Sequence, residues 1–289
     1  WIAPALAVMA GAFFAVFEPA RMSAALPILV MWVAAPWIAW WISLPIESAT
    51  PDLTEIQQAF LRRTARRTWH YFETFVTAKE NWLPPDNYQE VPEPVVAIRT
   101  SPTNMGLALL ANLAARDLGY ISAGGLVQRT HDALEAMQRL KRYRGHFYNW
   151  YDTRTMEPLP PLYISSVDSG NLSGHLMTLA AGLREQADEI LHPPEILAGL
   201  LDTVRILREA GPENAALALM EEALHKASRS PREILALLRR LTEEGRKAAA
   251  SAGSERQFHH WMQILKANAE DHLNEMLLLS PWLALPSST

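Results

Sequence analysis

The strongest constraint in this sequence is an apolar segment close to its start. Residues 22–46 contain no charged side chain, and about 25 residues are enough for a helix to cross the hydrocarbon core of a bilayer. A shorter apolar segment, residues 2–17, precedes it, and Glu18 and Arg21 interrupt the two. Three tryptophans stand near the end of the longer segment, where aromatic side chains favour the membrane interface: Trp37, Trp40 and Trp41. We therefore expect two transmembrane helices within residues 1–46.

A cleaved signal peptide is the alternative for an apolar start. No basic n-region or plausible cleavage site accompanies it, and a second apolar segment follows at once. The basic residues that follow are Arg62, Arg63, Arg66 and Arg67, whereas the loop between the spans has only Arg21. The positive-inside tendency then places everything after residue 46 in the cytoplasm. We expect the four arginines to form a solvated helix face near the lipid headgroups.

Overall composition excludes several functions. The net charge of -5 and a pI near 6.0 argue against a nucleic-acid partner, which would require a basic face. The chain has no cysteine, so disulfides, thiolate nucleophiles and cysteine metal sites are excluded. Three histidines near the end, His259, His260 and His272, are interpreted as exposed helix residues because no carboxylate–histidine spacing accompanies them. We expect no metal site in this segment.

The rest of the chain predicts an all-α architecture. Apolar spacing predicts a helix to about residue 77, and a stretch with five prolines, 81–104, predicts an ordered loop or extended strap. Further helices are expected at 105–118, 126–140 and 171–186. Ser101 followed by Pro102 predicts the N-terminus of the first of these helices, and Gly119 predicts its end. Buried and amphipathic helices alternate there and are joined by unequal loops, which favours a helical toroid over a simple four-helix bundle. Residues 195–289 are rich in Ala, Leu, Glu and Arg and predict a helical insertion or hairpin.

The segment from Tyr143 to Asn171 has aromatic side chains that follow no helical period. Aromatic walls with a few polar groups are typical of sites for small polar ligands, and aromatic rings also stack on sugars. The candidate substrate-binding residues are Tyr148, Asn149, Trp150, Tyr151, Asp152, Asp168, Ser169 and Asn171. Core packing of a long loop also explains the aromatic residues, and spacing alone does not establish a sugar site. Asp168 or Ser169 could instead cap the following helix.

Three stretches carry a resemblance to a known family: "NWLPPDNYQEVPEPVVAIRTSPTNMGLALLANLAARDLGYI", "YRGHFYNWYDTRTMEPLPPLYISSVDSGNLSGHL" and the tryptophan-rich segment before them. They resemble cyclic β-1,2-glucan synthases, large inner-membrane enzymes of Gram-negative bacteria. The resemblance covers roughly residues 1–190. It implies the end of a membrane glycosyltransferase region followed by the first part of a glucoamylase-like (α/α)6 domain that closes the glucan ring.

The resemblance also implies how the chain is divided. We expect transmembrane helices at 1–46, a juxtamembrane helix and proline-rich strap at 47–95, the first (α/α)6 helices at 96–190 and a helical insertion or hairpin at 191–289. A toroid lacking half its helices would expose inner apolar faces, such as that from Leu107 to Leu113.

The activity implied is a retaining transglycosylation that cyclises β-1,2-glucan. Glycoside chemistry uses two carboxylates, but the family's "GTMFEY" and "GISESAY" motifs are absent here, so we expect the catalytic glutamates outside this chain. No cofactor is expected in this segment, while UDP-glucose and a divalent metal belong to the transferase region outside it. Implied partners are β-1,2-linked glucan, the lipid bilayer and the remainder of the synthase. The alternatives are a membrane-tethered scaffold and a module that binds linear glucan without turnover.

Overall fold

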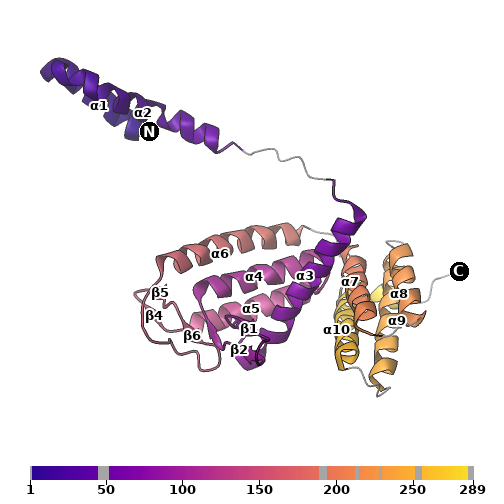
Figure 1. Cartoon of the computed structure of the whole chain (residues 1–289). Helices are drawn as coiled ribbons and strands as arrows, with labels where there is room; N and C mark the ends of the chain where they lie inside the picture. The colour runs from indigo at the N-terminus through magenta and orange to yellow at the C-terminus, as the bar shows by residue number, and fades with distance from the viewer. Residues whose placement is uncertain are drawn as a thin grey trace. The chain divides into compact units, whose positions relative to one another are not determined.

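The computed structural model describes residues 2–44, 52–188, 194–211, 215–227, 230–250 and 256–285. It divides into two compact units, Trp1–Leu53 and Thr54–Thr289 (Figure 1). The described residues are predominantly helical, with a few two-residue strands, so the predicted all-α class is confirmed.

The first unit is a helical hairpin. Helix α1 (Ile2–Phe17) packs on α2 (Met22–Ile42), and a 3-10 turn (Pro19–Arg21) joins them. By length and composition, one described helix, Pro19–Ile42, could cross a membrane, while the apolar helix Ile2–Phe17 is shorter. The predicted end of the second span, residues 45 and 46, lies outside the described residues.

The second unit begins with α3 (Glu55–Phe75), whose arginines correct our prediction of a solvated face in part, because Arg63 and Arg67 are exposed but Arg62 and Arg66 are not. Arg66 is fully buried, and Arg62 bonds the buried carboxylate of Asp202 on α7 (Glu195–Ala210). Arg63 and Arg67 bond Glu209 of the same helix. The acidic partners lie far along the chain, so the local pattern of α3 could not reveal them.

The proline-rich stretch is an ordered strap, as predicted. Strand β1 (Tyr88–Gln89) pairs with β2 (Val95–Val96) in an antiparallel ladder. Strand β3 (Arg99–Thr100) pairs with β6 (Tyr151–Asp152), and β4 (Arg142–Tyr143) with β5 (His146–Phe147). The β3–β6 ladder therefore joins the end of the strap to the loop from Tyr143 onward.

Helices α4 (Pro102–Asp117), α5 (Ala123–Arg139) and α6 (Ser166–Ala187) lie beside one another (Figure 1). Helix α4 packs on both others and contributes Met105 and Leu109 to their shared core. Gly106 permits the close approach of α6, because a Cβ there would lie 2.3 Å from Nδ1 of His175. This arrangement is consistent with part of an (α/α)6 toroid, and the full toroid stays a prediction.

The start of α6 differs from the predicted start at residue 171. The helix begins at Ser166, and Ser165 is its N-cap, with Oγ accepting a hydrogen bond from the amide of Asp168 at 3.1 Å. Asp168 and Ser169 therefore belong to the first turn and do not cap the helix. The apolar spacing that marks a helix is missing here, because the first turns contain four consecutive polar or small residues, 168–171.

Helices α7, α8 (Ala215–Lys226), α9 (Pro231–Ala250) and α10 (Arg256–Leu279) share a core of their own around Leu200, Leu238 and Leu265. A short 3-10 turn (Pro281–Ala284) follows. The predicted helical character of this range is confirmed for its described residues, and its assignment as an insertion or hairpin stays a prediction.

Helix α10 contacts the start of α5. Carboxylate oxygens of Asp271 and Glu275 accept hydrogen bonds from the amides of Ser122, Ala123 and Gly124, and negative charge is favourable at a helix N-terminus. The interpretation of His272 as exposed was wrong: the residue is buried, and Nε2 lies 3.1 Å from the carbonyl oxygen of Gly119. The spacing within α10 did not reveal which face meets α5.

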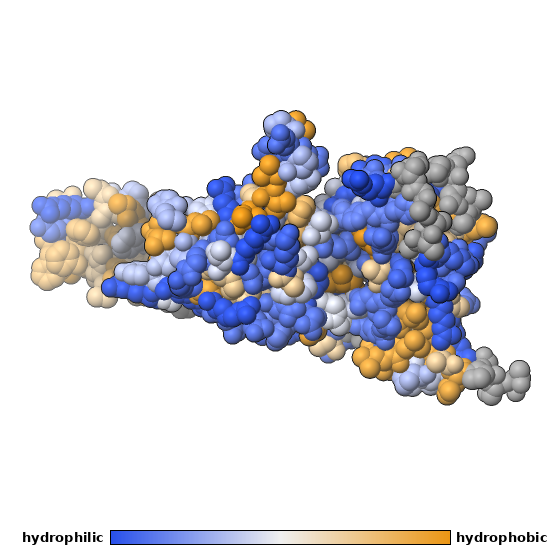
Figure 2. Space-filling model, turned by 90° about the horizontal axis from the view of Figure 1, so that it is seen from below, coloured by the Kyte–Doolittle hydropathy of each residue, from blue (hydrophilic) through white to orange (hydrophobic). Residues whose placement is uncertain are grey.

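Apolar side chains remain exposed on α4 and α6. Leu107 of α4 keeps 46% of its surface and Met177 of α6 keeps 75%, whereas Leu109 is fully buried. The exposed inner face that we expected from Leu107 to Leu113 is therefore confirmed only in part. Figure 2 shows one face of the molecule, mainly hydrophilic with separate apolar patches.

Candidate functional site

The loop between α5 and α6 is anchored by a buried tyrosine. The ring of Tyr151 is fully buried, and its hydroxyl donates to the carbonyl of Lys141 and accepts from the amide of Tyr148, both at 2.7 Å. Tyr148 packs at the edge of the core shared by α4, α5 and α6. Among the predicted binding residues, Tyr151 thus holds the loop together and presents no free ring face, whereas Tyr148 is half-buried and keeps part of its surface.

Asp152 and Ser169 also bond to nearby backbone. Oδ1 of Asp152 accepts from the amides of Arg154 and Thr155 at 2.8 Å. Burial alone would raise the pKa of Asp152, but these hydrogen bonds outweigh it and hold the pKa below its usual value. The hydroxyl of Ser169 donates to the carbonyl of Ser165 at 2.8 Å. Both residues therefore stabilise local structure.

Asn149 lies at the centre of a group of polar side chains. With its amide oriented to satisfy its neighbours, Nδ2 donates to Oδ2 of Asp168 at 2.9 Å. Its oxygen accepts from the indole of Trp150 at 2.8 Å and from the hydroxyl of Tyr163 at 2.7 Å. The amide is 5% exposed, so this network fixes three side chains from the loop and from α6.

Asp168 is held as a carboxylate at the start of α6. Burial opposes its charge, but hydrogen bonds with Ser165, Thr103 and Ser101 prevail and lower the pKa of Asp168. The N-terminus of a helix favours negative charge as well. Nδ2 of Asn171 donates to Oγ1 of Thr103 at 3.1 Å. The start of α6 therefore contacts the start of α4, and α4 follows directly after β3 in the chain.

The strap contributes a cation to this group. The guanidinium carbon of Arg99 lies 4.6 Å from the centre of the Trp150 ring, and Nη2 donates to Oδ2 of Asp86 at 3.0 Å. Asn104 donates to Oδ1 of the same carboxylate at 3.2 Å. We call Arg99, Asn149, Trp150, Tyr163 and Asp168 the polar cluster.

The sequence singled out three members of the polar cluster and missed Arg99 and Tyr163. It also missed Asp86, Thr103 and Asn104, which surround the cluster. The run "RTSPTN" contains Arg99 and Thr103, and its Ser-Pro pair predicts a helix start. Its relation to Trp150 arises from the β3–β6 pairing, which joins segments far apart in the chain.

The polar cluster combines an aromatic ring, a cation, an amide, a phenol and an ionised carboxylate. Such groups can stack on an apolar sugar face and exchange hydrogen bonds with hydroxyls. A general acid would need a raised pKa, whereas the pKa of Asp168 is lowered. Asp168 is therefore suited to accept a hydrogen bond from a ligand hydroxyl and unsuited to donate a proton.

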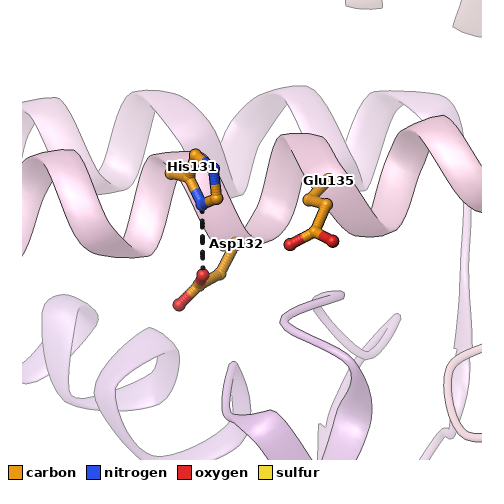
Figure 3. Close-up of side chains that lie close together, drawn as sticks. All are labelled: His131, Asp132 and Glu135. Carbon is orange, nitrogen blue, oxygen red and sulfur yellow. Dashed lines mark hydrogen bonds and ion pairs between the residues drawn. The ribbon is translucent and has the colours of Figure 1, made fainter.

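A second group of side chains lies on α5. The ligand atoms of His131, Asp132 and Glu135 lie within 4.8 Å of one another (Figure 3). His131 and Glu135 are exposed, and both oxygens of Asp132 already accept from the amide of Gln128, at 2.9 and 3.0 Å. Exposed acidic groups of this kind are common without a metal, and nothing else in the described residues points to a ligand here.

Comparisons with known proteins agree with the resemblance. Residues 63–171 match a family described as protein of unknown function (DUF3131), a range that includes every predicted binding residue. The chain is 44% identical over 213 residues to cyclic beta-(1,2)-glucan synthase NdvB from Rhizobium meliloti (strain 1021). That match covers 73% of this chain and 8% of the relative. The matched part of the chain thus spans less than a tenth of that relative's length, and the resemblance to this family is confirmed.

A solved structure also matches at low similarity. It is a putative glucoamylase from Bacteroides fragilis NCTC 9343, 18% identical, with a TM-score of 0.30. The match covers 63% of this chain and 37% of the other.

Proposed function

We propose that this chain is a segment of a membrane-bound enzyme that makes cyclic β-1,2-glucan, and that its polar cluster binds the glucan. The observation that carries the proposal is the 44% identity to a cyclic beta-(1,2)-glucan synthase. The matched family range ends at Asn171, so it contains the whole polar cluster. In this role the segment holds the glucan during the retaining transglycosylation that closes the ring.

The chemistry of the polar cluster supports a binding role. Tyr163 keeps 45% of its surface and Trp150 is half-buried, so both rings retain surface for a ligand. Asn149 and Asp168 stand beside them with fixed orientations. Rigid, prearranged polar groups lose little entropy when a ligand binds.

Binding is tested with linear β-1,2-glucan on the full chain in detergent micelles. Isothermal titration calorimetry should detect heat with β-1,2-glucan, and Asp168→Asn should weaken the affinity because the amide replaces one acceptor by a donor. Asp132→Asn, on α5 and outside the polar cluster, is the matched control and should bind as the parent does. Equal affinity in the parent and in Asp168→Asn would contradict a role for the polar cluster.

The catalytic carboxylates, in this proposal, lie outside this chain, as do the sites for UDP-glucose and its divalent metal. The experiment compares this chain with a version that continues downstream in the gene, each incubated with β-1,2-glucan. Cyclic product should form only with the longer version. Cyclic product from the present chain alone would show that its own carboxylates suffice.

The proposed location is the bacterial inner membrane, with residues after about 46 in the cytoplasm. The span Pro19–Ile42 supports an anchor, and the arginines that follow support the orientation. A reporter enzyme that is active only in the periplasm, fused after Phe75, should be inactive in this topology. An active fusion would reverse the orientation.

A module that binds linear glucan without turnover is the second candidate. The lowered pKa of Asp168 fits this candidate, because the ionised group can accept hydrogen bonds but cannot protonate a leaving group. It fits the enzyme segment equally, because the proposed catalytic carboxylates of that enzyme lie outside this chain. The two candidates differ in one measurement, since only the enzyme segment should raise the rate of ring closure when the rest of the synthase is present.

A further inference from the structure

Two histidines from distant helices face each other in the second unit. His70 lies on α3 and His260 on α10, and their Nε2 atoms are 3.2 Å apart. The ring centroids are 5.0 Å apart, with the planes at 59°. Two imidazole nitrogens at this distance share either a proton or a metal ion, because two bare lone pairs would repel each other.

The environment of His70 sets its ring orientation. Nδ1 lies 3.4 Å from Oε2 of Glu73, and the same carboxylate oxygen accepts from Nη2 of the buried Arg66 at 3.1 Å. The ring of Trp261 packs against His70 at 4.5 Å between centroids. A carboxylate on one imidazole nitrogen favours a proton there and leaves the other nitrogen free as a ligand.

The separation of the two Nε2 atoms matches the geometry of a metal site. Zinc binds imidazole nitrogen at about 2.0–2.1 Å, so two ligands at the tetrahedral angle are about 3.3 Å apart. His260 is exposed and His70 is partly exposed, so water can reach the pair and fill further positions. Burial and the neighbouring His70 also lower the pKa of His260, which favours the neutral, ligating form.

We propose that His70 and His260 bind a divalent transition metal of the zinc type through their Nε2 atoms, with Glu73 orienting His70. Imidazole ligands select zinc, copper, nickel or cobalt over magnesium and calcium. Among the described residues, no third imidazole or carboxylate completes this pair within 4.8 Å, so water supplies the remaining ligands and the ion stays exchangeable. The bound ion links α3, which follows the membrane segment, to α10.

The site is separate from the polar cluster and does not depend on glucan binding. It revises our expectation, from helix spacing alone, that no metal binds here. That expectation considered only histidines and carboxylates close together in the sequence of α10, whereas the partner of His260 is His70 on α3.

The test uses the full chain in detergent micelles after treatment with a chelator. Thermal unfolding is followed by circular dichroism as zinc or magnesium is added, because a ligand that binds only the folded state raises Tm. Zinc should raise Tm and magnesium should not. The increase should vanish in His70→Gln and in His260→Gln. His259→Gln and His131→Gln are the controls, and both should keep the increase.

Cobalt absorption gives a second measurement. Imidazole coordination of cobalt(II) should produce a visible absorption band in the parent, and this band should be lost in His260→Gln. Because His260 is exposed, its replacement should leave the fold intact, so misfolding would not explain the loss of the band. If zinc leaves the Tm of the parent unchanged, the proposal is wrong. It is also wrong if zinc raises the Tm of both site variants by as much as it raises that of the parent. In the second case, loss of the increase in His131→Gln would place the ion on α5.

Discussion

The guanidinium of Arg66 lies 5.0 Å from the centre of the Trp261 ring, joining the first and last long helices of the second unit. Nε of Arg66 also donates to Oγ1 of Thr203 on α7 at 2.8 Å, and its guanidinium carbon lies 5.3 Å from the centre of the Tyr120 ring. The buried guanidinium of Arg66 thus connects α3, α7 and α10 within their shared core. Lysine could not replace it, because an ammonium lacks the flat, branched donors.

Arg66→Ala should strongly destabilise the second unit. Removal of one partner of a buried ion pair costs about 3–5 kcal/mol, and Glu73 would lose its contact with Arg66 at 3.1 Å. Chemical denaturation of the full chain, followed by tryptophan fluorescence, measures the loss. The control is Arg67→Ala, whose side chain is 57% exposed and which should cost less than about 1 kcal/mol. Similar losses in the two variants would contradict the buried role of Arg66.

Two glycines on facing helices should respond oppositely to alanine. In Gly106→Ala the new Cβ would lie 2.3 Å from Nδ1 and 2.9 Å from Cβ of His175, so α4 and α6 must separate at a cost of about 1–3 kcal/mol. Nothing lies within 4 Å of a Cβ at Gly174, and Gly174→Ala should stabilise α6 by about 0.5–1 kcal/mol. Thermal unfolding measures the Tm of both variants. Destabilisation by Gly174→Ala would contradict the prediction and show that another part of the protein packs against α6 at Gly174.

Trp150 and Tyr151 are neighbours with different expected roles. Trp150→Ala should weaken β-1,2-glucan binding on the order of tenfold, about 1.4 kcal/mol, as for an aromatic side chain in a binding hot spot. Tyr151→Phe should retain the affinity but lose about 1–3 kcal/mol of stability, because two buried backbone groups lose a partner. Calorimetric titration and unfolding of each variant separate the two effects. An unchanged affinity in Trp150→Ala would support the scaffold alternative.

The buried His272 should make the second unit less stable in mild acid. Burial lowers the pKa of His272, although the carboxylate of Asp271 and the carbonyl of Gly119 oppose this effect. The unfolded chain therefore binds the proton more tightly, with a pKa near 6.5. This stability contribution is present above about pH 6.5 and is lost as the pH falls toward the folded-state pKa.

The measurement compares Tm between pH 7.5 and pH 5.5. His272→Gln keeps a donor toward Gly119 but cannot titrate, so its Tm should fall less than that of the parent over this range. The other charged groups near this histidine, Arg116 and Glu275, are retained in both proteins. A parallel fall of the two Tm values would assign the pH dependence to other residues.

Local sequence rules predicted much of the helical framework. Ser101 followed by Pro102 placed the start of α4, and Gly119 marked its end with a φ of +78°. Both features depend on the backbone of one or two residues, so a single sequence reveals them. The start of α6 was misplaced, since the N-cap Ser165 precedes a run of polar residues that lacks a period.

The candidate site was predicted only in part, for a similar reason. Asn149, Trp150 and Asp168 were visible as aromatic and polar residues in one segment. Arg99 and Asp86 lie in the strap, and their distance from Trp150 depends on strand pairing. Residue type also could not distinguish Tyr151, which is buried, from Trp150, which keeps partial exposure.

The sequence by itself determined the all-α class, the apolar span at the start and the identity of most helices, because these depend on composition and on short-range periodicity. The tertiary structure decided that the arginines of α3 are bonded to α7, that His272 is buried and that His70 meets His260. Those contacts join residues from helices far apart in the chain. Their energies depend on how the helices pack, and no local pattern contains that information.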